Sequence, residues 1–301
     1  MKQKNSFSGQ IGFVFAAAGS AVGVGNLWRF PYLAAKDGGG LFLLIYLVLV
    51  LTVGFVLLTT DIAIGRKTGK SAIYAYESMQ KKWKFLGVIT FLVPVLIMTY
   101  YAVIGGWILR YIVIYLTSSG KQAVADDCFT AFISSPSSVW YGLIFMLLTA
   151  LIVYNGVEDG IERVSKFIMP VLLIMVIGIA IFSLTLKTTL DDGTVRTGLQ
   201  GLKVYMKPDL TGITVGRFLQ ITLDAMSQLF FSLSVSMGIM ITYGSYVKND
   251  IDLNKATNQI EIFDTGVAIL AGKKTLHFTF QHFRICSILQ SCFRSDSVFL
   301  V

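Results

Sequence analysis

The stretch that decides the fold is Gly19-Ser-Ala-Val-Gly-Val-Gly-Asn-Leu-Trp-Arg-Phe-Pro31, which lies inside the first long apolar run of the chain. That run extends from about residue 11 to about residue 35, and a bilayer-spanning helix needs roughly 20 predominantly apolar residues. Glycine is the weakest ordinary helix former, and a polar amide such as that of Asn26 is costly in lipid without a partner. Hydrocarbon tolerates a broken helix only where the freed backbone groups line a cavity or lie within protein. The stretch therefore predicts an interrupted span with a binding site at its break.

A second interruption is predicted in a later apolar run, at Phe230-Phe-Ser-Leu-Ser-Val-Ser-Met-Gly238, where three serines alternate with other residues. The simpler interpretation is that small residues allow helices to pack closely, and Gly19 and Gly23 have the spacing of such a contact. Close packing does not explain Asn26. Two interrupted spans predict a site near the middle of the bilayer.

The composition indicates a membrane protein with several spans. Of 301 residues, 54% are hydrophobic and 14% are charged, whereas about a quarter of the residues in a soluble domain are charged. The net charge of +8 is spread over loops, which argues against a nucleic-acid partner, and three cysteines without metal-ligand spacing argue against a disulfide scaffold or a zinc site. Apolar runs predict spans near 11–35, 41–64, 85–116, 138–154, 164–186 and 215–246, and a seventh run that begins near 259 and is cut short by Lys273 and Lys274.

Asp264 lies inside an apolar run, 260–270, where an ionised carboxylate is expensive and usually marks an ion or substrate path. The alternative is a partly hydrated residue near a helix start. Asn26, Ser232 and Asp264 offer side-chain oxygens to a hard cation, and carbonyls of a broken helix complete such sites. Asp264-Thr265-Gly266 also matches a short aspartic-protease signature, but that chemistry needs two carboxylates and the triplet occurs once. An intramembrane hydrolase is therefore the weakest reading, and we expect no enzyme.

These motifs, with the third-span and sixth-span residues Tyr100-Tyr101, Trp107 and Ile241-Thr-Tyr-Gly-Ser-Tyr246 and the triplet Gly38-Gly-Gly40, resemble the neurotransmitter:sodium symporter family. The resemblance is to the bacterial amino-acid branch related to the leucine transporter, and it extends from about residue 5 to about residue 272. It implies an all-α, incomplete inverted-repeat fold with about seven spans, of which the first and sixth are broken. In that arrangement residues 1–186 form the first five-helix repeat, 187–214 an extracellular loop, 215–272 the sixth span and part of the seventh, and 273–301 an anomalous tail.

The resemblance also implies roles for individual residues. A first sodium ion is bound by the Ala21 carbonyl and the side chains of Asn26, Ser232 and Asp264, and the Gly19 and Val22 carbonyls are ligands of a second. The substrate carboxylate rests on the amides of Val24 and Gly25 beside the Tyr101 hydroxyl. The other substrate-binding residues are Ala21, Ile97, Phe231, Ser234 and Met237. Lys4 and Phe7 belong to a cytoplasmic gate and Arg29 to an extracellular gate.

At two positions, Gly23 and Asp264, this chain differs from other members of the family, and each difference bears on the substrate or ion that we expect it to bind. Monoamine carriers of this family have an aspartate where this chain has Gly23, so the resemblance favours a zwitterionic amino acid that brings its own carboxylate. Relatives commonly have asparagine at the Asp264 position, and in chloride-dependent members a bound chloride supplies negative charge nearby. Because Asp264 supplies that charge itself, we expect no chloride requirement.

The expected function is sodium-coupled symport of a small zwitterionic amino acid by alternating access. Basic residues are more frequent in the loops on the N-terminal side of the membrane, which predicts a cytoplasmic N-terminus in a bacterial cytoplasmic membrane. A membrane sensor that binds an amino acid without moving it is the alternative. Residues 273–301 contain no Gly, Ala, Pro, Tyr or Trp although 28 glycines precede them, which suggests a frameshift or other truncation and a nonfunctional fragment as a further alternative. The oligomeric state is left open.

Overall fold

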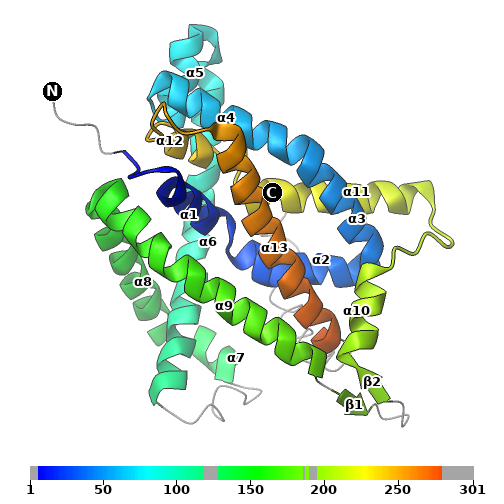
Figure 1. Ribbon diagram of the computed structural model, residues 1–301. Coiled ribbons are helices and arrows are strands. Elements are labelled where there is room, and N and C mark those ends of the chain that lie inside the picture. The colour runs from blue at the N-terminus through cyan, green and yellow to red at the C-terminus, as the bar shows by residue number, and fades with distance from the viewer. Residues whose placement is uncertain (1–5, 118–127, 186, 190–194, 280–301) are drawn as a thin grey trace. The chain divides into compact units, whose positions relative to one another are not determined.

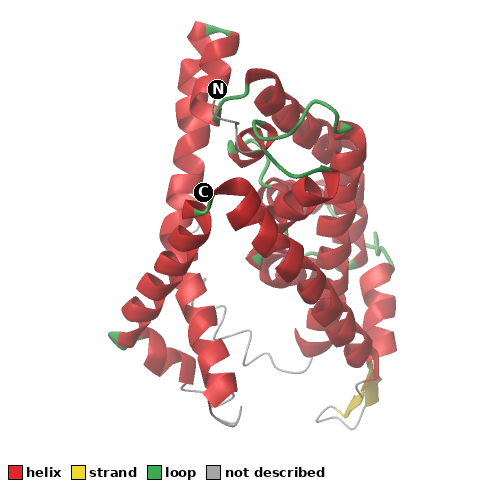
Figure 2. Ribbon diagram, turned by 60° about the vertical axis from the view of Figure 1, so that its left-hand side comes forward, coloured by secondary structure: helices red, strands yellow, loops and turns green. Residues whose placement is uncertain are grey.

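The computed structural model describes residues 6–117, 128–185, 187–189 and 195–279, and nearly all of them are helical (Figures 1 and 2). The α-helices are α1 (Gln10–Ala21), α2 (Phe30–Lys36), α3 (Gly40–Leu49), α4 (Phe55–Thr68), α5 (Ala72–Met79), α6 (Lys84–Thr117), α7 (Cys128–Ile133), α8 (Ser137–Tyr154), α9 (Arg163–Thr185), α10 (Gly198–Met206), α11 (Val215–Leu233), α12 (Ile239–Gly244) and α13 (Leu253–Thr279). Short π-helical turns are η1 (Gly25–Arg29), η2 (Val50–Gly54) and η4 (Val157–Glu162), and η3 (Lys81–Trp83) is a 3₁₀ turn. Strands β1 (Lys187–Thr189) and β2 (Val195–Thr197) form an antiparallel pair.

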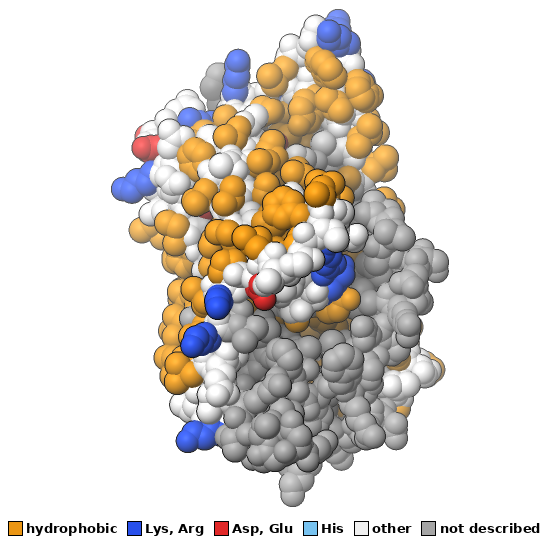
Figure 3. All heavy atoms as spheres, turned by 90° about the vertical axis from the view of Figure 1, so that its right-hand side faces the viewer, with side chains coloured by type: hydrophobic (Ala, Val, Ile, Leu, Met, Phe, Trp, Pro, Cys, Tyr) orange, Lys and Arg blue, Asp and Glu red, His pale blue; other side chains and the backbone are white. Residues whose placement is uncertain are grey.

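The described helices include four that are long and apolar enough to cross a membrane: Gly40–Thr68, Lys81–Thr117, Ser137–Tyr154 and Val157–Thr185. They confirm the spans expected near 41–64, 85–116, 138–154 and 164–186. A fifth candidate is the pair Gln10–Ala21 and Gly25–Lys36, whose two parts are bent by 53°. The described part of the face in Figure 3 is mostly hydrophobic, with few and scattered charged side chains, as a lipid-facing surface requires.

Both expected interruptions are present. The first span is broken between the end of α1 at Ala21 and the start of η1 at Gly25. The sixth is broken after Leu233, where Ser234 and Ser236 have left-handed φ values of 52° and 60°. Non-glycine residues rarely adopt that conformation, and each costs on the order of 1–3 kcal/mol unless its surroundings hold it. The serine-rich sequence thus marks a backbone that tertiary contacts keep out of the helix.

The seventh run differs from its expected limits. The helix α13 begins at Leu253, earlier than 259, because Asp252 caps it: its carboxylate accepts the amides of Asn254 and Lys255 at 3.0 and 3.2 Å. The helix also continues through Lys273 and Lys274 to Thr279. Lysine is a good helix former, so a hydropathy limit is not a helix limit. Residues 280–301 of the anomalous tail lie outside the described residues.

The chain divides into two compact units, each assembled from three stretches. Unit 1 comprises Met1–Phe13, Asp61–Ser165 and Ser236–Ile251. Within it α12 packs closely on α4, because a Cβ atom on Gly65 would lie 1.9 Å from the Ile241 carbonyl oxygen. In the same way, α6 meets α8 at Gly106, where a Cβ atom would lie 2.6 Å from the Gly142 nitrogen. Glycine at these positions permits backbone-to-backbone contact.

Unit 2 comprises Val14–Thr60, Lys166–Val235 and Asp252–Val301. Its core includes Ala18 and Val22 from the first span, Met169 and Val176 from α9, and Val267 from α13. A second group of aromatic rings, Phe30, Phe42 and Tyr46, stacks where α2 meets α3. Unit 2 therefore surrounds the first-span break and contains all the residues expected to bind sodium.

Candidate sodium and substrate site

The three side chains expected to bind sodium form one hydrogen-bonded cluster in unit 2. The Asn26 amide nitrogen donates to the Asp264 carboxylate at 2.8 Å and to the Asp264 backbone carbonyl at 3.0 Å. The Ser232 hydroxyl lies 2.8 and 3.0 Å from the two Asp264 carboxylate oxygens and 3.1 Å from the Asn26 side-chain oxygen. All three residues are buried, at most 1% exposed. Residues 26, 232 and 264 thus converge although the sequence separates them widely.

The Asp264 carboxylate is the charged centre of this cluster, and it has no basic partner among the described residues. Its other neighbour is Tyr46, whose hydroxyl donates at 3.4 Å to the second carboxylate oxygen. A buried carboxylate is paired with a cation or neutralised, because desolvating an unpaired charge is very costly. The clustered carboxylate, amide and hydroxyl oxygens are those that a hard cation such as sodium prefers. The donor set therefore fits sodium as a transported ion.

The backbone at the first-span break faces the same cluster. The Gly23 amide donates to the Asn26 side-chain oxygen at 3.4 Å, while Val22 still closes the last turn of α1 by donating to Ala18 at 2.7 Å. The carbonyls of Gly19, Ala21 and Val22 belong to this last turn, where a helix end leaves acceptors without helical donors. The amides of Val24 and Gly25 stand where the second half of the span begins. A helix N-terminus favours an anion such as a carboxylate.

Two residues of α11, Gln228 and Phe231, contact Gly25 at the first-span break. The Gln228 amide nitrogen donates to the Gly25 carbonyl at 3.1 Å, and Gln228 is fully buried. A Cβ atom on Gly25 would lie 3.0 Å from the Phe231 ring, so glycine is needed for this approach. Ser234, also expected in the substrate pocket, is buried and has a left-handed conformation at the end of α11.

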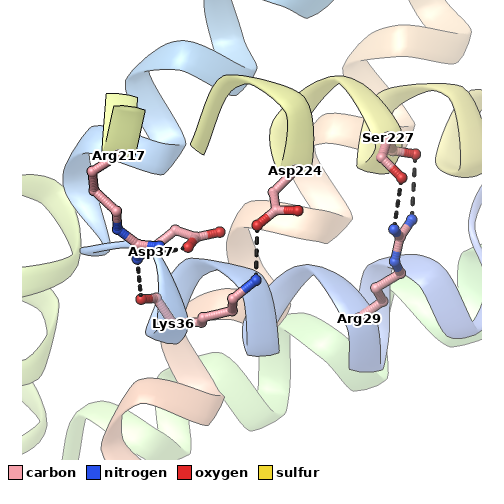
Figure 4. A network of polar contacts seen from close by, with 6 residues as sticks. All are labelled: Arg29, Lys36, Asp37, Arg217, Asp224 and Ser227. Atoms are coloured by element: carbon pink, nitrogen blue, oxygen red, sulfur yellow. Dashed lines mark hydrogen bonds and ion pairs between the residues drawn. The ribbon is translucent and has the colours of Figure 1, made fainter. Parts of the chain in front are cut away.

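A ladder of polar contacts joins the second half of the first span, η1 and α2 with the residue after it, to α11 (Figure 4). The Arg29 guanidinium donates to the side chain and carbonyl of Ser227 at 2.7 and 3.3 Å and lies over the Phe231 ring. Further along, Lys36 pairs with Asp224 at 2.8 Å, and Arg217 pairs with Asp37 at 2.9 Å. Arg29, which was expected in the extracellular gate, thus makes the first of three contacts that connect the first span to α11 within unit 2.

Asp37 is the buried member of the ladder. Its side chain is fully buried, and its second carboxylate oxygen has no hydrogen-bond partner among the described residues. In Figure 4 this carboxyl group faces that of Asp224. Burial raises the pKa of Asp37 to about 6; the Asp224 charge adds to this rise, and Lys36 and Arg217 oppose it.

The remaining expected residues lie in unit 1. Phe7 is fully buried and packs edge-on against Tyr243, and its amide donates to the Tyr246 carbonyl at 3.2 Å. Ile97 and Tyr101 are one helical turn apart on α6, and Met237 lies in the sixth-span break. Lys4 lies outside the described residues. The roles of these residues, and of those in unit 2, stay predictions.

Several buried polar residues were not expected from the sequence, and three of them lie near the breaks or near Asp264. Asp61 accepts the Ser236 amide at 2.7 Å and so supports the left-handed turn of the sixth span. Glu261, 4% exposed, lies one helical turn before Asp264, and Gln228 is described above. The signal for the carboxylates was available, since Asp61 and Glu261 stand in apolar runs as Asp264 does. Gln228 carried no such signal, because glutamine is common on helix surfaces.

Interrupted helices around a buried carboxylate define the class of protein: a membrane protein with discontinuous helices, an architecture that secondary transporters use. The profile of the Sodium:neurotransmitter symporter family matches residues 4–135 and 129–279. The chain belongs to this family, and it is a multi-pass membrane protein.

Individual relatives agree with this assignment. The sodium-dependent transporter YhdH of Bacillus subtilis is 36% identical over 274 residues, which cover 88% of this chain and 57% of YhdH. A sodium-dependent transporter of Methanocaldococcus jannaschii is 34% identical over 290 residues, covering 90% and 55%. The crystal structure of MhsT in complex with L-phenylalanine is similar with a TM-score of 0.78 and 36% identity, over 92% of this chain and 62% of MhsT. The chain thus spans little more than half the length of these relatives.

Proposed function

We propose that this chain belongs to a sodium-coupled symporter of a small zwitterionic amino acid, which works by alternating access with its N-terminus in the bacterial cytoplasm. The observation that carries the proposal is the buried Asp264 carboxylate, bonded to Asn26 and Ser232 and without a basic partner among the described residues. A sodium ion at these oxygens supplies the missing positive charge. The named sodium dependence of the relatives supports the same conclusion.

The amino acid is proposed to bind beside the sodium site. The amides of Val24 and Gly25 begin the second half of the first span, and a helix N-terminus favours a carboxylate. The sodium ion next to this position attracts the same carboxylate, so that ion and substrate bind together. The binding of L-phenylalanine by MhsT supports an apolar or aromatic side chain, and Phe231 offers an aromatic surface next to Gly25.

Chloride is proposed to be unnecessary. Both Asp264 carboxylate oxygens accept hydrogen bonds, one from Asn26 and Ser232 and the other from Tyr46 and Ser232. Those hydroxyl and amide donors are already directed at an anion that belongs to the protein. A second anion there would be repelled by Asp264. The mammalian relatives named as chloride-dependent, such as GABA transporter 2 of Bos taurus at 23% identity, do not decide this point.

The experiment measures binding and uptake of labelled L-phenylalanine by the purified chain in proteoliposomes. Binding in sodium and its loss in potassium are expected, with no change when gluconate replaces chloride. Asn26→Ala is expected to weaken binding at least about tenfold, since one lost charge-assisted hydrogen bond or ligand costs roughly 1.5–3 kcal/mol. Asn155→Ala is the matched control, because Asn155 is exposed and, among the described residues, its side chain bonds only to the carbonyl of Leu151.

Three results bear on the proposal separately. Binding that is equal in sodium and potassium would contradict the sodium site. Loss of binding in gluconate would contradict chloride independence alone. Sodium-dependent binding without accumulation driven by a sodium gradient would favour the sensor over a symporter for this 301-residue chain.

A further inference from the structure

Arg110 is a cation near the end of a membrane span, and the transport proposal gives it no role. It lies on α6, four residues after Gly106, where α6 makes close contact with α8 at Gly142. This contact brings Arg110 against Tyr141, whose hydroxyl accepts from the guanidinium at 3.3 Å. The guanidinium also lies over the rings of Tyr141 and Phe132, 5.6 and 5.9 Å from their centroids. Two aromatic faces therefore hold Arg110 in place.

The hydrogen-bonding capacity of Arg110 is mostly unused. A guanidinium has five N–H donors. Its only hydrogen bond among the described residues is the one to Tyr141, it forms no ion pair there, and its Nε atom is buried without a partner. Cation–π contacts do not replace hydrogen bonds to these donors, and an intramembrane arginine is costly unless an anion or carbonyl accepts from it. The arginine needs an acceptor that the described residues do not supply.

The position of Arg110 along the span places it at the membrane surface. From Trp83 at the start of the span to Arg110, the helical rise of about 1.5 Å per residue gives about 40 Å, and even a tilt of about 20° leaves more than the ~30 Å of hydrocarbon. Trp107 lies one turn earlier, and Trp140, 67% exposed, lies beside Tyr141. Tryptophan and tyrosine gather at the level of lipid headgroups.

The surface of α6 and α8 next to this level is apolar, and on α6 it continues beyond Arg110, where Ile112 and Leu116 are exposed. Three apolar side chains on α6 and α8 are well exposed here: Ile108 at 50%, Val139 at 63% and Leu143 at 50%. A lipid acyl chain fits beside such side chains, while the headgroup reaches the guanidinium. Phosphate is the complementary group, because the planar fork of arginine matches two phosphate oxygens at once.

We infer that Arg110, held by Phe132 and Tyr141 at the junction of α6 and α8, binds the phosphate of a phospholipid headgroup. The occupant is a membrane lipid and not free phosphate, because the cation stands at headgroup depth beside an apolar surface. The bound lipid seals the end of the α6–α8 contact and neutralises the cation. This role does not involve the proposed sodium site, since all the residues that form it lie in unit 1 and Asp264 lies in unit 2.

The test is native mass spectrometry of the purified full chain titrated with dioleoyl phosphatidylglycerol, compared with dioleoylglycerol, which has the same tails without phosphate. The wild type is expected to retain phosphatidylglycerol in preference to dioleoylglycerol. Arg110→Gln is expected to reduce phosphatidylglycerol retention about tenfold, corresponding to the loss of a charge-assisted pair. Arg163→Gln is the matched control, because Arg163 is exposed and pairs only with Asp159 among the described residues.

Two milder variants keep the test decisive if Arg110→Gln fails to fold. Arg110→Lys keeps the charge but loses the fork, and Tyr141→Phe removes only the hydroxyl that orients the guanidinium. Each is expected to weaken phosphatidylglycerol retention about threefold. Equal retention by all the variants, equal retention of dioleoylglycerol, or displacement of the lipid by millimolar glycerol phosphate would overturn the inference.

Discussion

At the scale of single residues, Asp264 determines what the site attracts. Asparagine at this position would keep an oxygen but bring no charge, whereas the carboxylate makes the cluster with Asn26 and Ser232 negative. In a dry interior that charge acts strongly on a nearby cation, because the low dielectric weakens its screening. In the proposed sodium site, this one side chain therefore lets the protein itself provide the counter-charge that a second ion would otherwise supply.

The substitution Asp264→Asn tests whether the Asp264 carboxylate supplies the negative charge at the proposed sodium site. The variant is expected to bind sodium about tenfold more weakly in gluconate than in chloride, because an external anion must now supply the charge that the carboxylate carried. The wild type is expected to show the same sodium affinity in both anions. Sodium-dependent shifts of the thermal unfolding midpoint in detergent provide the measurement.

Asp209→Asn is the control, since Asp209 is exposed and its carboxylate accepts from Thr211 in a loop. If Asp264→Asn binds sodium with the same affinity in chloride and in gluconate, the counter-charge does not come from Asp264.

At the scale of elements, the broken spans are held by side chains from elsewhere in the fold. Within unit 2, three polar contacts to α11 come from Arg29 at the end of η1, Lys36 at the end of α2 and Asp37 just after it. Within unit 1, Asp61 on α4 accepts the Ser236 amide and keeps the sixth-span turn from closing into a helix. Each break is therefore supported by an adjacent element rather than by its own sequence.

The link between Asp37 and Arg217 is expected to depend on pH. Burial raises the pKa of Asp37 from 3.8 to about 6, so the folded protein takes up this proton at a higher pH than the unfolded chain. Asp37 therefore favours the folded state more as pH falls from about 6 toward 4, and this contribution is lost as pH rises through 6. Relative to Asp37→Asn, the wild type is expected to gain on the order of 2 kcal/mol between pH 7 and pH 4.

Thermal unfolding of both proteins across this pH range measures the difference. Using Asp37→Asn as the reference cancels the titration of all other groups. A difference that is constant with pH, or that favours the wild type more at pH 7, would show that Asp37 does not titrate in this window.

The helices α4 and α12 are in close backbone contact at Gly65. A Cβ atom on Gly65 would lie 1.9 Å from the Ile241 carbonyl oxygen and 2.9 Å from the Ser245 nitrogen. Gly65→Ala is therefore expected to force the helices apart and to destabilise the protein by about 1–3 kcal/mol, the usual range for overpacking. The unfolding midpoint in detergent is the measurement.

Gly178→Ala is the matched control, because no atom lies within 4 Å of a Cβ atom at this exposed helical position. Alanine there is expected to be neutral or to stabilise α9 by about 0.5–1 kcal/mol through helix propensity. Equal midpoints for the two variants would contradict close packing of α4 on α12.

At the scale of the whole molecule, each unit is built from stretches that are distant in sequence. The run expected to form the sixth span passes from unit 2 to unit 1 within its break, between Val235 and Ser236, whereas the first span passes from unit 1 to unit 2 after Phe13, inside α1 and well before its break. All the expected sodium ligands belong to unit 2, whereas Phe7, Ile97, Tyr101 and Met237 belong to unit 1. Binding at the proposed sodium site therefore involves one unit, and it is the part of the proposed function that this chain tests most directly.

The sequence by itself determined the spans, the two breaks and the candidate ligands Asn26, Ser232 and Asp264, because apolar runs and misplaced polar residues are local signals. Only the tertiary structure decided that these three side chains form one cluster, that Tyr46 joins it, that Gln228 donates to the Gly25 carbonyl, and that Asp61 accepts the Ser236 amide in the sixth-span turn. It also extended α13 beyond the hydropathy limit. The physical reason is that hydrogen bonds between residues some two hundred positions apart depend on how helices pack, and no local pattern records that packing.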